Sequence, residues 1–238
     1  MRIREMRSFP KPGVWLALLL LAVASPPVRA QTNADLERVL GQMDKAAANF
    51  RSAEAIFVWN QYAKVVDETD TQKGRIFFRR NGSDTQMAAD VMEPDKKYVV
   101  YSEGKVQLYQ PKIDQVTVYN TGKDKAAVES FLVLGFGGGG HDMLKSFDVK
   151  YVGTETVDGV ETAKLELTPK SEKLRNTFAH ILLWIDPARG ISVQQQFFEP
   201  SGDYRLAKYS DIRLNQKIPD QAFKLKTTGK TKVVSPQG

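Results

Sequence analysis

The chain has 238 residues, a formal net charge of +6 at pH 7 and no cysteine. The absence of cysteine excludes disulfides, thiolate metal sites, a thiol nucleophile and a lipid-modified cysteine. The positive charge is concentrated in the first 30 residues, which leaves about +2 on the remainder. So small an excess gives no support to binding of nucleic acid, which needs a concentrated basic patch.

Residues 1–30 have the pattern of a secretory signal peptide. Basic residues precede a short apolar run over residues 14–23, and small residues end the segment at Ala30. A membrane anchor is the alternative, but a spanning helix needs about 20 apolar residues. The sequence therefore predicts export to a bacterial periplasm, cleavage after Ala30, and one soluble mature domain over residues 31–238.

The mature chain is predicted to begin with an amphipathic helix. Apolar residues recur at helical spacing from Leu36 to Phe50, and residues 32–35 resemble a capping box. Because the apolar residues fall on one side, that side of the helix is expected to pack against the rest of the domain.

Two strands are predicted to follow the helix, over residues 55–66 and 74–80, with a polar turn over residues 67–72 between them. Side chains alternate between the two faces of a strand, so every second residue shares a face. Large apolar residues occupy such positions here: Phe57, Trp59, Ile76 and Phe78. These residues are expected to face inward.

Beyond residue 96 the chain has the pattern of successive β-hairpins. Turn dipeptides such as Glu103-Gly104 and Asp158-Gly159 separate runs of β-forming residues. The runs predict strands over residues 97–102, 105–110, 115–120, 147–154, 162–168, 179–185, 191–198 and 204–214. Spacing of about ten residues per strand favours an antiparallel sheet over parallel βαβ units. The predicted fold is mainly β, with one curved antiparallel sheet and a covering segment.

The covering segment interrupts the hairpins. Residues 126–134 predict a short apolar helix, and residues 135–140 hold five glycines. Their spacing fits a dinucleotide-binding loop, but that loop needs parallel strands and a helix beside it, and hairpins surround it here. Because glycines lose much entropy on ordering, we interpret the segment as a flexible hinge in a mobile lid. The lid's large apolar side chains are Phe131, Leu132, Leu134 and Phe136.

Neither of the two histidines, His141 and His180, belongs to a recognisable catalytic or metal-binding pattern. His141-Asp142 is compatible with half of a metal site or with a base and its orienting group. The simpler interpretations are that His141 caps a helix start and that His180 lies on a strand face with Leu182 and Trp184. No carboxylate pair is singled out for hydrolysis. We therefore predict no catalytic residue, no metal and no cofactor.

The inward apolar positions of the strands are the candidates for a ligand cavity. They are Phe57, Trp59, Ile76, Phe78, Val100, Leu108, Val118, Leu165, Leu167 and Phe197. A long sheet with one apolar face and little helix to cover it favours binding of an apolar ligand. A filled core explains the same set of residues equally well, and periodicity alone leaves both interpretations open.

A series of short motifs runs through residues 36–226. The motifs are Asn49-Phe50, Gly74 ahead of Arg79-Arg80, Glu93-Pro94, Ser102-Glu103-Gly104-Lys105, Tyr109-Gln110-Pro111, Gln115-Val116, Leu167-Thr168-Pro169-Lys170 and Phe223-Lys224-Leu225. In this order and spacing they resemble the LolA-like family of periplasmic carriers of outer-membrane lipoproteins. The resemblance implies an open antiparallel half-barrel whose concave face is apolar and covered by helices. It also implies a monomer that carries acylated lipoproteins or lipids.

The same resemblance implies an inner-membrane transporter as donor, an outer-membrane receptor as acceptor, and one special arginine. In the family an arginine at the end of the second strand reaches inside and holds the lid, and Arg80 occupies that place here. A solvated charge at the strand end is the alternative. The chain departs from the family where Asn81 replaces a proline and where Thr85, Gln86 and Met87 replace aromatic residues.

The sequence thus predicts a periplasmic carrier that binds acyl chains in an apolar cavity and moves them from the inner to the outer membrane, without covalent chemistry. An envelope sensor or regulatory module on the same fold is one alternative, and it predicts a lasting protein complex. An exported hydrolase is the other, although no convergent polar site supports it.

Overall fold

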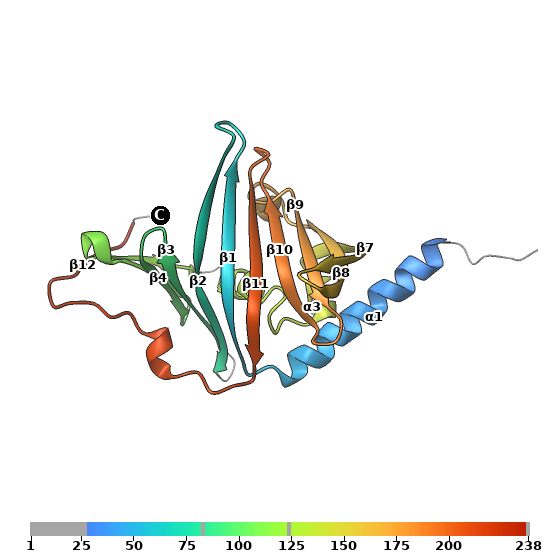
Figure 1. The fold of residues 1–238 in the computed structure, drawn as a ribbon, viewed down its shortest axis with the longest axis horizontal. Helices are drawn as coiled ribbons and strands as arrows, with labels where there is room; N and C mark the ends of the chain where they lie inside the picture. Colours follow the sequence, from blue (N-terminus) through green and yellow to red (C-terminus); the bar gives the residue numbers. More distant parts are fainter. Residues whose placement is uncertain (1–27, 82–83, 123–124, 237–238) are drawn as a thin grey trace, which may run out of the picture.

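A computed structural model describes residues 28–81, 84–122 and 125–236, and one large sheet dominates it (Figure 1). The strands are β1 Ser52–Ala63, β2 Glu68–Asn81, β3 Asp84–Glu93, β4 Lys97–Ser102, β5 Lys105–Gln110, β6 Gln115–Asn120, β7 Phe147–Val157, β8 Val160–Pro169, β9 His180–Asp186, β10 Ile191–Phe198, β11 Tyr204–Leu214 and β12 Lys232–Val234. The α-helices are α1 Val28–Asn49, α2 Lys125–Leu132, α3 Gly140–Met143 and α4 Glu172–Arg175, and two 3₁₀ turns are η1 Pro111–Ile113 and η3 Asp220–Phe223. Most of the predicted signal peptide, residues 1–27, lies outside the described residues.

The sheet has twelve strands in the order β12-β6-β5-β4-β3-β2-β1-β11-β10-β9-β8-β7. All neighbours are antiparallel except β12 and β6, which are parallel. β7 and β12 form two separate edges, so the sheet is open. The predicted fold class, mainly β with one open antiparallel sheet and few helices, is confirmed.

The bounds of several predicted elements differ from the structure by a few residues, among them β7, β8, β9 and α2, and three differences are larger. The helix α1 begins at Val28, so the predicted capping box at residues 32–35 lies inside the helix. The turn between β1 and β2 occupies residues 64–67, and most of the predicted polar turn belongs to β2. β3 and β12 were not predicted at all. β3 has alanine, aspartate and methionine at its centre, residues with weak strand preference, and only pairing with β2 and β4 identifies it.

The concave face is covered by α1 at one end of the sheet and by the lid at its centre. Val39, Leu40 and Met43 of α1 lie in the same buried cluster as the inward residues of β8 and β9. Figure 1 shows α1 running across the β7–β8 end of the sheet. The apolar face of this helix, predicted from its spacing, is therefore the face that packs.

The convex face carries its own apolar contacts. The chain beyond β11 returns across β3 and β4, where Ile218 and Phe223 pack on Ala88 and Val100. Arg79 fixes this segment from β2, because its guanidinium lies 4.4 Å from the Phe223 ring centre and 2.6 Å from Asp220. This returning segment ends in β12, which extends the sheet beyond β6.

We expect Leu165→Ala to lower the free energy of unfolding by about 2–5 kcal/mol, because Leu165 is fully buried under α1 and the change leaves a cavity. Val65→Ala is the control, since Val65 at the β1–β2 turn is 94% exposed and its truncation should change stability by less than about 0.5 kcal/mol. Urea unfolding of both variants measures the difference. Equal effects would contradict the packing of α1 on β8.

Candidate lipid cavity

An apolar cavity of about 420 Å³ lies between the centre of the concave face and the lid. Its walls come from β1 to β5 and from β10 and β11, and its cover comes from α2 and the turn after it. The volume falls within the range of about 300–1,000 Å³ that is usual for small-molecule sites. The inward side of the sheet centre is therefore hollow, in contrast to the filled region under α1.

Six of the ten predicted cavity residues line this cavity. They are Phe57, Trp59, Ile76, Phe78, Leu108 and Phe197. Antiparallel pairing aligns several of them in rows across the sheet, as with Ile76 opposite Ala89 and Val99 opposite Leu108. These six residues come from four strands, so the pairing of the sheet brings them to one place.

The other four predicted residues lie elsewhere. Val100 belongs to the convex-face cluster, and Val118 is aligned with it through Gln107, so both occupy the opposite face of the sheet from Leu108. Leu165 and Leu167 do face inward, but α1 covers them and both are fully buried in the core. A filled core is thus correct for one part of the concave face and a cavity for another.

Several lining residues were not singled out from the sequence. Those from β3 and β4 are Met87, Ala89, Val91, Lys97 and Val99, and the remainder are Gln72, Phe178, Gln195, Arg205, Ala207 and Tyr209. The alternation of Arg205, Ala207 and Tyr209 in β11 was a signal that could have found them. In β4 both Val99 and Val100 are apolar, so the pattern did not show which of them faces inward.

The lid places three of its four predicted residues over the cavity. Phe131, Leu132 and Phe136 line it, whereas Leu134 is buried in the core with α1. Phe136 is 1% exposed, because it stacks on Phe78 with ring centres 5.1 Å apart and meets the Tyr209 ring edge-on at 4.8 Å. The Phe136 side chain closes one end of the cavity, and we call it the plug.

Backbone carbonyls of the turn after α2 are bonded to the sheet. Gln195 Nε2 donates to the carbonyl of Leu134 at 2.5 Å, and the Ser192 amide donates to that of Gly135 at 2.8 Å. Tyr209 donates in turn to Gln195 Oε1 at 3.2 Å. Buried carbonyls are costly to leave unpaired, so these bonds stabilise the covered state.

Arg80 lies where the lid turn meets α1. Its Nη2 donates to the Gly137 carbonyl at 2.9 Å, its Nη1 donates to the Ala47 carbonyl at 3.0 Å, and its guanidinium lies 5.8 Å from the Phe50 ring centre. One arginine thereby joins the end of β2, the end of α1 and the lid. A role as the lid's latch, which the family resemblance implied, requires contacts of this kind.

The other end of the lid is bonded to the sheet through α2. Lys125 forms an ion pair with Asp84 of β3 at 2.7 Å, and Glu129 accepts a hydrogen bond from the hydroxyl of Tyr101 at 3.0 Å. Burial, followed by this hydrogen bond, raises the pKa of Tyr101 to about 12. The phenol therefore keeps its proton, and with it the hydrogen bond, at neutral pH.

Two glycines of the lid turn lie in close contact with neighbouring elements. A Cβ on Gly137 would lie 2.4 Å from the Phe50 ring, and one on Gly135 would lie 2.5 Å from Ser192 Cβ. Both residues have a positive φ, +80° for Gly135 and +81° for Gly137, which glycine adopts without strain. Close approach of the lid to Phe50 and β10 thus accounts for these two glycines, and the flexible hinge stays a prediction.

A second hollow of about 660 Å³ lies on the other side of the lid turn. Arg80, Leu134, Gly137 and Phe147 are among the residues around it, together with the end of α1. The turn from Leu134 to Gly138 therefore separates two hollows. Movement of this turn would change the size of the apolar cavity.

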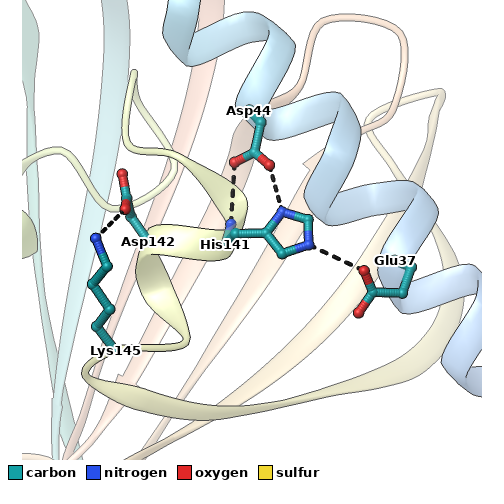
Figure 2. A network of polar contacts seen from close by, with 5 residues as sticks. All are labelled: Glu37, Asp44, His141, Asp142 and Lys145. Carbon is teal, nitrogen blue, oxygen red and sulfur yellow. Dashed lines mark hydrogen bonds and ion pairs between the residues drawn. The ribbon is translucent and has the colours of Figure 1, made fainter.

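His141 joins α3 to α1 through two carboxylates, as Figure 2 shows. Its Nδ1 contacts Asp44, its Nε2 is 3.0 Å from Glu37, and its amide donates to Asp44 Oδ1 at 3.1 Å. The hydrogen bond to Asp44, followed by that to Glu37, raises the pKa of His141. Burial raises the pKa of Asp44, but the hydrogen bonds and charge of His141 outweigh it and the net shift is downward.

This cluster does not have the geometry of a metal or catalytic site. Glu37 and Asp44 contact opposite nitrogens of one ring, so they do not converge on a common point, and Asp142 is paired with Lys145 at 2.7 Å. No group of three or more potential metal ligands occurs in the described parts of the chain. His141 lies in the first turn of α3, but the N-cap is Gly139, so the prediction that His141 caps the helix is wrong. Its side chain instead ties α3 to α1.

The cavity itself offers little for covalent chemistry. Among the described residues that line it there is no carboxylate, no histidine and no aliphatic hydroxyl. Its one hydroxyl belongs to Tyr209, whose pKa burial raises further above the ordinary value. His180, far from any such role, stacks on Phe198 with ring centres 4.2 Å apart.

None of the helices described in the structure is both long enough and apolar enough to cross a membrane.

Comparison with known proteins gives a family and a fold. The model of a protein family described as "Uncharacterized protein" matches residues 93–228, more than half of the chain. No curated protein matches the sequence.

Solved structures share the fold at low identity. An uncharacterized conserved protein from Thermus thermophilus has a TM-score of 0.55 and 12% identity, covering 84% of this chain and 99% of its own. MucB has a TM-score of 0.52 and 14% identity, covering 81% of this chain, which spans 63% of MucB. A LolA superfamily protein from Nitrosomonas europaea is more distant, with a TM-score of 0.40, 13% identity, and coverage of 80% and 97%; no conclusion rests on it.

We expect the bond between α1 and α3 to depend on pH through His141. A histidine whose pKa is raised on folding contributes stability below about pH 6.5, and this contribution is lost as pH rises through the raised pKa. The lowered pKa of Asp44 sets the acidic limit of the same window. His141→Gln should therefore lower the melting temperature more at about pH 5.5 than at about pH 9. His180→Gln is the control, and an effect of His141→Gln that is independent of pH would contradict the assignment.

Proposed function

The chain belongs to the family described as "Uncharacterized protein". We propose that it is a periplasmic carrier, which holds acyl chains of lipoproteins or a related lipid in the cavity under its lid. The observation that carries the proposal is the apolar cavity of about 420 Å³, closed at one end by the side chain of Phe136. A pre-formed hollow with mainly apolar and aromatic walls suits reversible binding of a hydrocarbon chain.

Capture on this proposal needs no covalent step. In the empty state Phe136 and its neighbours in the lid cover the apolar strands, and in the loaded state the acyl chain takes over those contacts. About a dozen buried methylenes contribute roughly 10 kcal/mol in total. Breaking the bonds that hold the lid, from Gln195, Ser192 and Arg80, subtracts from this sum. The net affinity remains low enough for the cargo to be handed on.

The remaining parts of the proposal follow the sequence. Residues 1–30 export the chain, which then works as a monomer in the periplasm. It receives its cargo from an inner-membrane transporter and delivers it to an outer-membrane receptor. No cofactor takes part, since the carrier only exchanges contacts with its own lid for contacts with the cargo.

Mass and displacement measurements test the proposal. Native mass spectrometry of the protein purified from its own periplasm should find an acylated molecule bound, and a fluorescent fatty-acyl probe should bind and be displaced by lipids. Phe78→Glu should abolish probe binding, because it introduces a charge into the apolar wall. A protein free of lipid that does not bind the probe would reject the carrier, and a stable protein partner in its place would favour the sensor.

The latch has its own test, for which the chain supplies a matched control. Arg80→Leu should speed amide hydrogen exchange in residues 131–138 and tighten probe binding by about tenfold, because opening the lid then costs about 1.4 kcal/mol less. Arg79→Leu removes the neighbouring arginine, which contacts Phe223 on the convex face. If the two variants exchange and bind alike, Arg80 is not a latch.

A further inference from the structure

Two cations line the apolar cavity, and the proposed function does not use them. Four lining residues carry long polar side chains, Gln72, Lys97, Gln195 and Arg205, and of these Gln195 is bonded to the lid turn. Phe78, Met87 and Phe136 form the end of the cavity that the lid turn closes. An amphiphile bound with its tail toward this end would have a cation on each wall, Lys97 on β4 and Arg205 on β11.

Strand pairing places Gln72 and Arg205 away from the plug. Lys97 lies nearer to it, because Val91, Gly74 and Phe57 align Lys97 with Tyr209, two inward positions closer to the plug than Arg205. In β2, Gln72 lies six residues before Phe78, so the two residues share a face and are about 20 Å apart along the strand. Gln72 is paired with Trp59, and Trp59 is paired with Ala207, so these three residues form one row. Arg205 lies one inward position further from the plug than Ala207.

Lys97 is a half-buried cation without a carboxylate partner. It lines the cavity from the first position of β4, yet no ion pair or hydrogen bond involves its ammonium among the residues that the structure describes. The acidic residues nearest in sequence are engaged elsewhere, since Glu93 pairs with Lys73 at 3.0 Å and Asp95 pairs with Lys112 at 3.5 Å. An anion entering the cavity is free to pair with Lys97.

Arg205 also has an unused donor. Its Nη2 forms an ion pair with Glu199 at 2.7 Å, while its buried Nε has no hydrogen-bond partner. The guanidinium carbon lies 6.0 Å from the ring centre of Phe178, another residue of the cavity wall. Arginine presents five donors suited to bidentate binding of carboxylate or phosphate. A bound anion would therefore satisfy a group that is otherwise buried and unpaired.

The size of the cavity limits the tail. A group the size of a water molecule occupies about 30 Å³, so about 420 Å³ holds on the order of a dozen methylene-sized groups. One acyl chain of ordinary length accounts for this volume. Two or three chains need the lid turn to move toward the second hollow.

We propose that the cargo of the covered cavity is a single acyl chain with an anionic headgroup, a carboxylate or a phosphate, attracted by Lys97 and Arg205 on opposite walls. The inference rests on the proposed function and narrows it to an anionic single-chain lipid. Four strand spacings of about 4.8 Å separate β4 from β11 along the curved sheet, and two inward positions, about 13 Å along the strands, separate the rows of Lys97 and Arg205. A headgroup that lies between the two walls is attracted by both cations.

Four ligands with the same twelve-carbon tail test the proposal: dodecanoate, dodecyl phosphate, dodecanol and dodecyltrimethylammonium. Each is titrated into delipidated protein at low and high salt. At low salt we expect at least one anion to bind ten times or more tighter than dodecanol, and dodecyltrimethylammonium to bind more weakly than dodecanol. Salt should reduce the preference for the anion, because it screens partly exposed charges. The stronger of the two anions identifies the headgroup chemistry.

Substitutions locate the effect. Lys97→Met with Arg205→Met should remove the preference for anions and leave dodecanol binding within about twofold, because methionine keeps the apolar stem. Lys208→Met with Arg213→Met is the control, since both residues are on β11 and neither lines the cavity. Phe78→Glu should abolish binding of all four ligands.

Different outcomes would contradict the headgroup preference and the proposed carrier function. Equal binding of anions and dodecanol by the wild type overturns the headgroup site but leaves the carrier intact. A preference that survives in the Lys97/Arg205 double variant overturns the assignment to these residues. Failure of all four ligands to bind the wild type rejects the acyl cavity itself, and with it the carrier.

Discussion

The packing of Phe136 on the sheet, together with the hydrogen bonds that hold its backbone, is the interaction on which the arrangement of the concave face depends. Its ring fills the space between Phe78 and Tyr209, while the carbonyls on either side of it accept hydrogen bonds from Gln195 and Arg80. Those two donors stand on β10 and β2, strands separated by β1 and β11 in the sheet. The turn therefore spans the centre of the sheet and closes the cavity without filling it.

The same contact explains why the two halves of the concave face differ. Under α1 the inward leucines of β8 lie with Val39, Leu40 and Met43 in one buried cluster, and the space is filled. At the centre the cover is α2 and a glycine-rich turn held by its backbone, from which Phe131, Leu132 and Phe136 face a hollow that remains. The glycines permit close approach of the lid to α1, Phe50 and β10.

The sequence predicts the fold well because alternation and turn chemistry agree along most of the chain. Five strands, β4, β5, β6, β10 and β11, have the predicted bounds, since clear turns separate them from their neighbours. β3 was missed because its sequence carries no strand signal of its own and its neighbours impose its conformation. In β4 two adjacent valines conceal the inward side, and only the register against β5 identifies Val99.

The site is harder to predict, because a cavity remains only where the covering element leaves space above the inward side chains of the sheet. The strand pattern of Leu165 and Leu167 is as regular as that of Ile76 and Phe78, yet only the second pair lines a hollow. What distinguishes them is the element that covers each pair, a contact between residues far apart in the sequence. Arg80 could be named in advance because the family resemblance singled it out, and its alternation with Ile76 and Phe78 in β2 agrees with an inward side chain.

In the proposed carrier, a lid bonded too firmly would keep cargo out, and one bonded too loosely would expose an aromatic surface to water. The described contacts lie between these limits, because the bonds to the lid are few and its one deeply buried ring, Phe136, presents the same kind of surface as a hydrocarbon chain. If an acyl chain replaces the Phe136 ring, the apolar surface of the sheet stays covered in both the empty and the loaded state. The free-energy difference between the states then depends on the polar bonds of the turn, which makes Arg80 and Gln195 the residues best placed to set how readily cargo enters and leaves.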